Sequence, residues 1–241
     1  MLVVFNNLDT ACLFLGQDEK YAWSKLDELH KELLGEEDSF RVEVRKKITW
    51  LMNRIPDFLC HYYEAEDGPL RNLSDLSEAE AEAQLQRIRL AGDRFASQRK
   101  EDYLSVRWEL EARVRALFVS KGGRPSRLHP HYFVLGECPW LKSWYPHGYE
   151  LRISLSAFRS DVVSFTYGDT FPAMRFADGK PTRGKIYTLD ELPSLVQEFG
   201  LPQVWNANGT GGPDRYIEAQ VWDDEPVQAC MWQRMPPGTA A

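Results

Sequence analysis

Cysteine is scarce in this chain. The 241 residues include four cysteines that lie far apart and show no CxxC spacing: Cys12, Cys60, Cys138 and Cys230. The sequence therefore predicts neither a disulfide framework nor a thiolate metal site. A chain of this length buries a sufficient core without disulfides. We interpret the cysteines as small buried hydrophobic residues of a reducing compartment.

Long apolar runs and excess positive charge are also missing. The N-terminal stretch MLVVFNNLDTACLFLG is too short to span a bilayer and has no basic segment, so neither a membrane helix nor a signal peptide is predicted. The formal net charge of -7 repels nucleic acid. We therefore expect a cytoplasmic protein that has neither a membrane nor a nucleic acid as its partner.

Most sequence motifs of catalysis are absent. There is no GxSxG elbow, no Walker loop and no GxGxxG. His129 and His131 lie two residues apart in HPHYFVLGEC, but a zinc site needs at least a third ligand and no other residue has ligand spacing. No metal site and no cofactor are expected on these grounds.

The first half of the chain has helical periodicity. Apolar residues recur every three or four positions over 18–34 and again from Ser39 to Leu59, where Pro56 predicts a kink. Ser77 and Glu80 have the spacing of a capping box. The apolar stripe that follows them continues to SKGG, which predicts one long helix or two helices joined near Gly92.

After Pro130 the pattern changes to short runs rich in β-branched and aromatic residues. These runs, bounded by Gly, Pro and Asp, are YFVLG, YELRISLSAF, DVVSFTY, GKIYT and RYIEAQVW. One helix interrupts them, with a capping box at Thr188 and Glu191 and a stop at Gly200. We predict an α+β fold in which a helical region, 1–122, packs on a domain, 123–241, with a mostly antiparallel sheet and one main helix.

Strand alternation places the candidate site residues and the apolar core residues on opposite faces of a predicted strand. In RYIEAQVW, Ile217, Ala219 and Val221 share one face, and the other carries a carboxylate and an amide between two aromatic rings. If this second face is buried, its polar groups need hydrogen-bond partners or a ligand. The alternative is a solvated face on which Glu218 pairs with an Arg or Lys of the neighbouring strand.

In DVVSFTYGDTFPAM, Val163, Phe165 and Tyr167 point to one side, and Asp169 follows in a turn. Tyr167 is placed either to stack on a planar ligand or to close the core.

The first hypothesis is a recognition protein that presents this polar-aromatic face or cleft to an unknown protein or small molecule. Its predicted binding residues are Tyr216, Gln220, Trp222, Asp169 and His129.

The second hypothesis comes from a resemblance. DVVSFTYGDTFPAM resembles the strand-and-turn segment of DNA-targeting ADP-ribosyltransferases, and YIEAQVW is similar to the strand that carries the essential Glu in ADP-ribosyltransferase-like families. The resemblance implies an NAD-dependent enzyme in which Glu218 binds the nicotinamide ribose. It also implies that Tyr167 stacks on nicotinamide and that His131 or His129 holds the adenosine side. A fixed carboxylate stabilises the oxocarbenium-like state formed when the glycosidic bond breaks.

Overall fold

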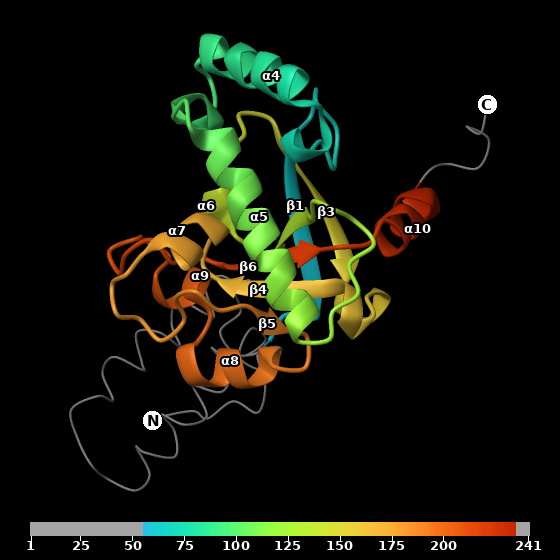
Figure 1. The fold of residues 1–241 in the computed structure, drawn as a ribbon, viewed down its shortest axis with the longest axis vertical. Helices are drawn as coiled ribbons and strands as arrows, with labels where there is room; N and C mark the ends of the chain where they lie inside the picture. Colours follow the sequence, from blue (N-terminus) through green and yellow to red (C-terminus); the bar gives the residue numbers. More distant parts are fainter. Residues whose placement is uncertain (1–54, 235–241) are drawn as a thin grey trace, which may run out of the picture.

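Six strands form a single open sheet in the order β3-β1-β2-β6-β4-β5 (Figure 1). The computed structural model describes residues 55–234. The strands are β1 (Phe58–Glu64), β2 (His131–Leu135), β3 (Gly148–Ser154), β4 (Val163–Tyr167), β5 (Tyr187–Thr188) and β6 (Ile217–Val221). Every pairing between these strands is antiparallel. Together with the helices described below, this agrees with the predicted α+β class.

Strand β1 corrects one prediction. The second predicted helix extended to Leu59, but the chain is a strand from Phe58, and each of its seven residues is paired with β3. Pro56 disfavours a helix that continues through it, and the aromatic residues of FLCHYYE suit a strand. The sheet therefore takes strands from both sides of the predicted boundary at 122/123. The helix predicted over 18–34 lies outside the described residues.

Helices surround this sheet. They are α4 (Glu78–Ala91), α5 (Tyr103–Ser120), α6 (Pro139–Lys142), α7 (Thr170–Arg175), α8 (Leu192–Phe199), α9 (Pro202–Trp205) and α10 (Glu225–Arg234). Single 3-10 turns are η2 (Leu73–Asp75), η3 (Phe95–Gln98), η4 (Leu155–Ala157) and η5 (Ser160–Val162). Helix α10 was not predicted, because its ten residues lack clear apolar periodicity. Within 55–234, no helix has both the length and the apolar character that a bilayer span requires.

Local signals set the helix ends. The capping box at the start of α4 is confirmed, since the Ser77 hydroxyl accepts from the Glu80 N–H and the Glu80 carboxylate accepts from the Ser77 N–H. Gly92, with φ of 68°, ends α4, so the apolar stripe forms two helices. Glu191 accepts from the Thr188 N–H at 2.8 Å, yet α8 begins only at Leu192. Gly200 ends α8 as predicted.

The two faces of the sheet are covered by different helices. One face packs against α8 and forms the main core, which contains Phe165, Tyr167 and Ile217. On the other face, α5 crosses β4 and β6 (Figure 1), and Phe118 stacks on Trp222 with ring centroids 6.3 Å apart. On this second face, the polar residues Glu218 and Gln220 lie between the aromatic residues Tyr216 and Trp222. This face carries the candidate site.

Candidate functional site

The alternation predicted for β6 is confirmed. Ile217, Ala219 and Val221 lie in the main core. The opposite face of β6 is buried as well, because Gln220 and Trp222 are 1% and 0% exposed beneath α5 and α7. Trp222 is therefore part of the hydrophobic interior and not an open recognition surface.

A cavity of about 620 Å³ lies at the end of this face, beyond the cover of α5. Its floor comes from β1, β2 and β6, and its walls come from α4, the segment 94–99, the start of α5, the loop 66–73, residues 141–145 and the start of α7. Five arginines line it, namely Arg71, Arg87, Arg94, Arg99 and Arg107. The aromatic lining includes Tyr62, Tyr103, Tyr132, Trp144, Tyr145, Phe171 and Tyr216.

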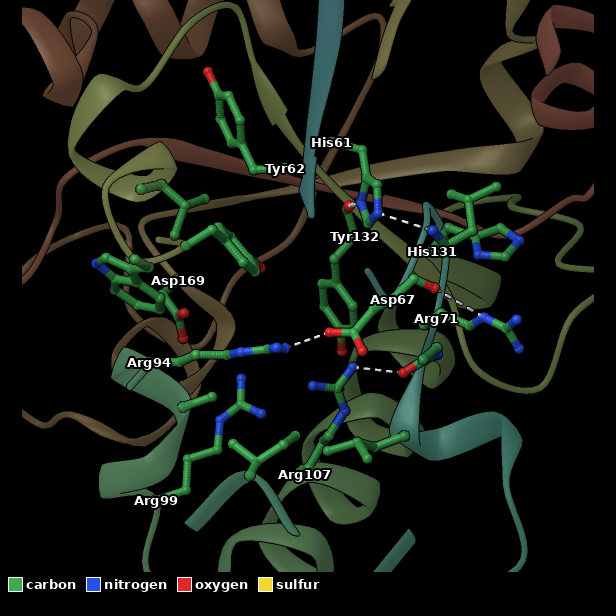
Figure 2. Close-up of a pocket in the computed structure, with 18 of the residues that line it drawn as sticks. His61, Tyr62, Asp67, Arg71, Arg94, Arg99, Arg107, His131, Tyr132 and Asp169 are labelled. Carbon is green, nitrogen blue, oxygen red and sulfur yellow. Dashed lines mark hydrogen bonds and ion pairs between the residues drawn. The ribbon is translucent and has the colours of Figure 1, made fainter. Parts of the chain in front are cut away.

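Three of these arginines, Arg94, Arg99 and Arg107, form what we call the arginine cluster. Figure 2 shows their side chains pointing toward one another, beside the carboxylate of Asp67. Burial raises the pKa of the Tyr145 hydroxyl, and the positive charges of the cluster oppose that rise, which places all of them near this hydroxyl. Gathering like charges in a partly buried place costs free energy unless negative charge balances them.

The cluster is only partly balanced from within the protein. Arg94 forms an ion pair with Asp67, and Arg107 forms one with Glu111 at 2.9 Å. Arg99 lies over the ring of Tyr103, 4.3 Å from its centroid, and has no carboxylate partner among residues 55–234. One positive charge of the cluster thus faces the cavity without a counterion from the described part of the chain.

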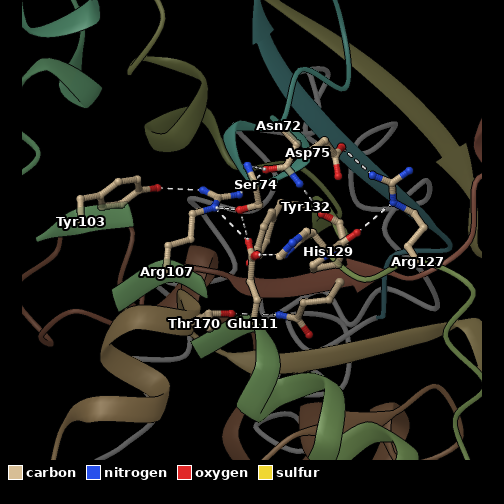
Figure 3. A network of polar contacts seen from close by, with 12 residues as sticks. Asn72, Ser74, Asp75, Tyr103, Arg107, Glu111, Arg127, His129, Tyr132 and Thr170 are labelled. Carbon is tan, nitrogen blue, oxygen red and sulfur yellow. Dashed lines mark hydrogen bonds and ion pairs between the residues drawn. The ribbon is translucent and has the colours of Figure 1, made fainter. Parts of the chain in front are cut away.

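A buried network holds Arg107 in place (Figure 3). Glu111 is 1% exposed, and its Oε1 accepts from the Ser74 hydroxyl at 2.9 Å, from Arg107 Nε at 2.9 Å and from the Tyr132 hydroxyl at 2.8 Å. Its Oε2 lies 2.6 Å from Nδ1 of His129. Every oxygen of this buried carboxylate is therefore satisfied, and the network positions the arginine. His129 belongs to this support and does not line the cavity.

Glu218 lies on the cavity floor. Its Oε1 accepts from the N–H and hydroxyl of Thr170, at 3.2 and 2.5 Å, and from Nε2 of Gln220 at 3.2 Å. Burial, and then the negative charge of Asp169, raise the pKa of this carboxyl to about 8. The group is therefore protonated at neutral pH.

Asp169 lies beside it at the start of α7. Its Oδ1 accepts from the Phe171 N–H at 2.8 Å, which caps the helix, and its Oδ2 accepts from the Tyr216 hydroxyl at 3.0 Å. Asp169, Tyr216 and Glu218 all line the cavity. Three of the predicted site residues are thus brought together, with two carboxyl groups in neighbouring positions.

No family model, curated protein or solved structure matches this chain. Within the described range, no three His, Cys, Asp or Glu side chains are grouped as metal ligands.

Of the remaining residues named by the ADP-ribosyltransferase hypothesis, Tyr167 lies in the main core and His131 lies at the edge of the cavity. Tyr167 faces the main core, where its hydroxyl donates to the Phe199 carbonyl at 2.6 Å and accepts from Trp205 Nε1 at 3.0 Å. His131 lines the cavity edge and binds Asp224 through Nε2 at 2.7 Å. Burial lowers the pKa of His131 although Asp224 opposes this, and its buried Nδ1 has no hydrogen-bond partner in the described structure.

Sequence reasoning missed the arginine cluster. Its members lie in RLAGDRFASQRK and the helix that follows, a stretch where four basic residues fall within 94–107. The number of basic residues in the connection between two helices and in the first turns of the second helix was the available signal. Periodicity alone does not show that α4 and α5 fold back so that this connection closes over the sheet.

Proposed function

We propose that the cavity binds a small anionic molecule, with its negatively charged group on the arginine cluster. The observation that carries this proposal is Arg99, which lines the cavity beside two other guanidinium groups and has no carboxylate partner among residues 55–234. Arg71 and Arg87 also line the cavity without a carboxylate partner in that range. Guanidinium groups bind phosphate and carboxylate in a bidentate way, which suits such an arrangement.

The cavity also suits a planar group. Tyr103 stacks on Phe171 with parallel rings whose centroids are 5.2 Å apart, and the Arg99 guanidinium lies 4.3 Å from the centroid of the Tyr103 ring. Tyrosines and a tryptophan form much of the remaining wall. Aromatic walls with few well-placed polar groups, and a volume of about 620 Å³, are typical of small-molecule sites. Phosphate and a planar ring together favour a nucleotide.

AMP and adenosine distinguish the contribution of the phosphate. We expect AMP to bind to the full chain in isothermal titration calorimetry, and adenosine to bind at least tenfold more weakly. Arg99→Ala should weaken AMP binding about tenfold or more, because a hydrogen bond to a charged group contributes about 1.5–3 kcal/mol.

Arg175→Ala is the matched control. Arg175 is exposed in the last turn of α7 and does not line the cavity, so this variant should bind AMP like the unaltered protein. Equal affinity for AMP and adenosine would contradict the proposal, as would equal losses in the two arginine variants.

A second candidate function is that of an NAD-consuming transferase with Glu218 as its key carboxylate. The position of Glu218 on the cavity floor, with His131 at the edge, favours it. Tyr167 has no part in this version, because it faces the main core. Incubation with labelled NAD and a cell lysate tests it through nicotinamide release and label transfer.

The pH dependence of that release has a definite sign. A carboxylate that stabilises a cationic transition state must be ionised. Because the pKa of Glu218 is raised to about 8, release should increase as pH rises from 7 to 9, and it should vanish in Glu218→Gln. Release that persists in this variant rules out the transferase role of Glu218.

A further inference from the structure

The two oxygens of the Glu218 carboxyl have different surroundings. All three of its hydrogen bonds within the described residues arrive at Oε1. Oε2 receives none, and the residue lines the cavity. An oxygen that already accepts three hydrogen bonds is poorly placed to carry a proton, so a protonated Glu218 carries it on Oε2.

A buried chain of hydrogen bonds fixes this asymmetry. The indole N–H of Trp222 donates only, and it binds the Ser164 hydroxyl at 2.9 Å. Ser164 must therefore pass its own proton on, to the Gln220 oxygen at 2.9 Å. The amide of Gln220 is thereby oriented with its NH₂ toward Glu218 Oε1, and it cannot turn without breaking the bond to Ser164.

Among residues 55–234, no lysine, arginine or histidine forms an ion pair with Glu218. Asp169 lies near it from the start of α7, Tyr216 lies just before β6, and Tyr132 lies near it on β2, opposite Gln220. These groups are acidic or neutral. They disfavour a second negative charge on the cavity floor and favour a proton that stays in place.

We infer that Glu218 determines ligand specificity by presenting its Oε2–H to the cavity as a hydrogen-bond donor, so that the ligand carries an uncharged acceptor opposite its anionic group. This inference rests on the proposed function and specifies the ligand class. A ring nitrogen or a carbonyl oxygen is accepted at this position. An ammonium group has no lone pair with which to accept the hydrogen bond from Oε2–H, so it is disfavoured at this position.

The test is AMP binding as a function of pH between 7 and 9.5, where the AMP phosphate keeps its charge. Glu218→Leu, which removes the donor, should weaken AMP binding at least tenfold at pH 7. Glu218→Gln should restore it, because the amide keeps an acceptor toward Thr170 and places an N–H where Oε2–H was. Thermal melts of both variants separate lost binding from lost folding.

The pH profile distinguishes a donor from a merely structural role. With a pKa of about 8, the protonated fraction falls to about 3% at pH 9.5, so the affinity of the unaltered protein for AMP should fall about 30-fold while that of Glu218→Gln stays constant. Affinity that rises with pH, or binding that Glu218→Gln fails to restore, overturns the inference.

A titration without ligand keeps this inference separable from the proposed function. The ¹³C chemical shift of the labelled Glu218 carboxyl, assigned by comparison with Glu218→Gln, should titrate with a midpoint near 8. A midpoint below about 6 overturns the inference even if AMP binds. Absence of AMP binding at every pH overturns the proposed function, and with it the ligand class.

Discussion

Glu218→Gln should make the protein more stable at neutral pH. In the native state the pKa of Glu218 is raised to about 8 from its ordinary value of 4.5. Between these two values the native state holds a proton that the unfolded chain has released, so this group lowers stability as pH rises through that window, and the full cost applies above pH 8. The amide has no such cost, because it never ionises.

The magnitude follows from the same two values. One pKa unit corresponds to about 1.4 kcal/mol, so at pH 7 the penalty removed by Glu218→Gln is at most about 3 kcal/mol. At pH 5 the two proteins should differ by less than about 1 kcal/mol by the same relation. The signature of the effect is thus a stability difference that grows with pH.

Glu111→Gln is the matched control, since it makes the same change at another buried glutamate. Glu111 is 1% exposed but accepts from Arg107, and His129 lies 2.6 Å from its other oxygen. Removing its charge leaves the Arg107 guanidinium without its counterion, which for a buried pair costs about 3–5 kcal/mol. The same substitution is therefore expected to have opposite effects at the two positions.

Urea unfolding at pH 5, 7 and 9, followed by tryptophan fluorescence and linear extrapolation, measures both variants against the unaltered protein. If Glu218→Gln were destabilising by more than 1 kcal/mol at pH 7, or if its effect did not change with pH, the protonated state assigned to Glu218 would be refuted. A neutral Glu111→Gln would show that the Arg107 network contributes little.

Further predictions concern the helix start, a turn and the core face. Ser77→Ala should cost about 1 kcal/mol of unfolding free energy in the same assay, since it removes the capping hydroxyl of α4. Gly168→Ala should destabilise by about 1–3 kcal/mol or more, because φ is 94° and a Cβ atom would lie 2.6 Å from Asp214 Oδ1. Tyr167→Phe should leave AMP affinity unchanged in calorimetry and should lower stability by about 1 kcal/mol through two lost hydrogen bonds. A loss of AMP binding in this last variant would place Tyr167 in the site after all.

Alternation along strands was the most informative pattern in the sequence. It placed Ile217, Ala219 and Val221 on a core face and Glu218 on the other, because side chains on a strand must alternate. Helix ends at Ser77 and Gly92 followed from backbone hydrogen-bonding groups that local residues satisfy. These features depend on neighbours within a few residues, and such neighbours are visible in a sequence.

The cavity was not predictable in the same way. Its floor joins residues 60–62 and 131–134 with Tyr216 and Glu218, and Arg99 reaches it from a connection between two helices. Strand β1 was missed because Leu59 also fits a helical stripe, and only its pairing with β2 and β3 decides between the two. Long-range pairing and the closing of helices over the sheet are not encoded in local periodicity.

The place of β6 in the sheet has a consequence for biosynthesis. Of the six strands within residues 55–234 it is the last to be synthesised, yet it pairs with β2 on one side and β4 on the other and thereby joins β3-β1-β2 to β4-β5. A nascent chain that ends before residue 217 holds two half-sheets with open edges, which are templates for aggregation. A nonsense mutation upstream of this codon therefore removes the β6 part of the cavity floor and also leaves a product that quality control must clear.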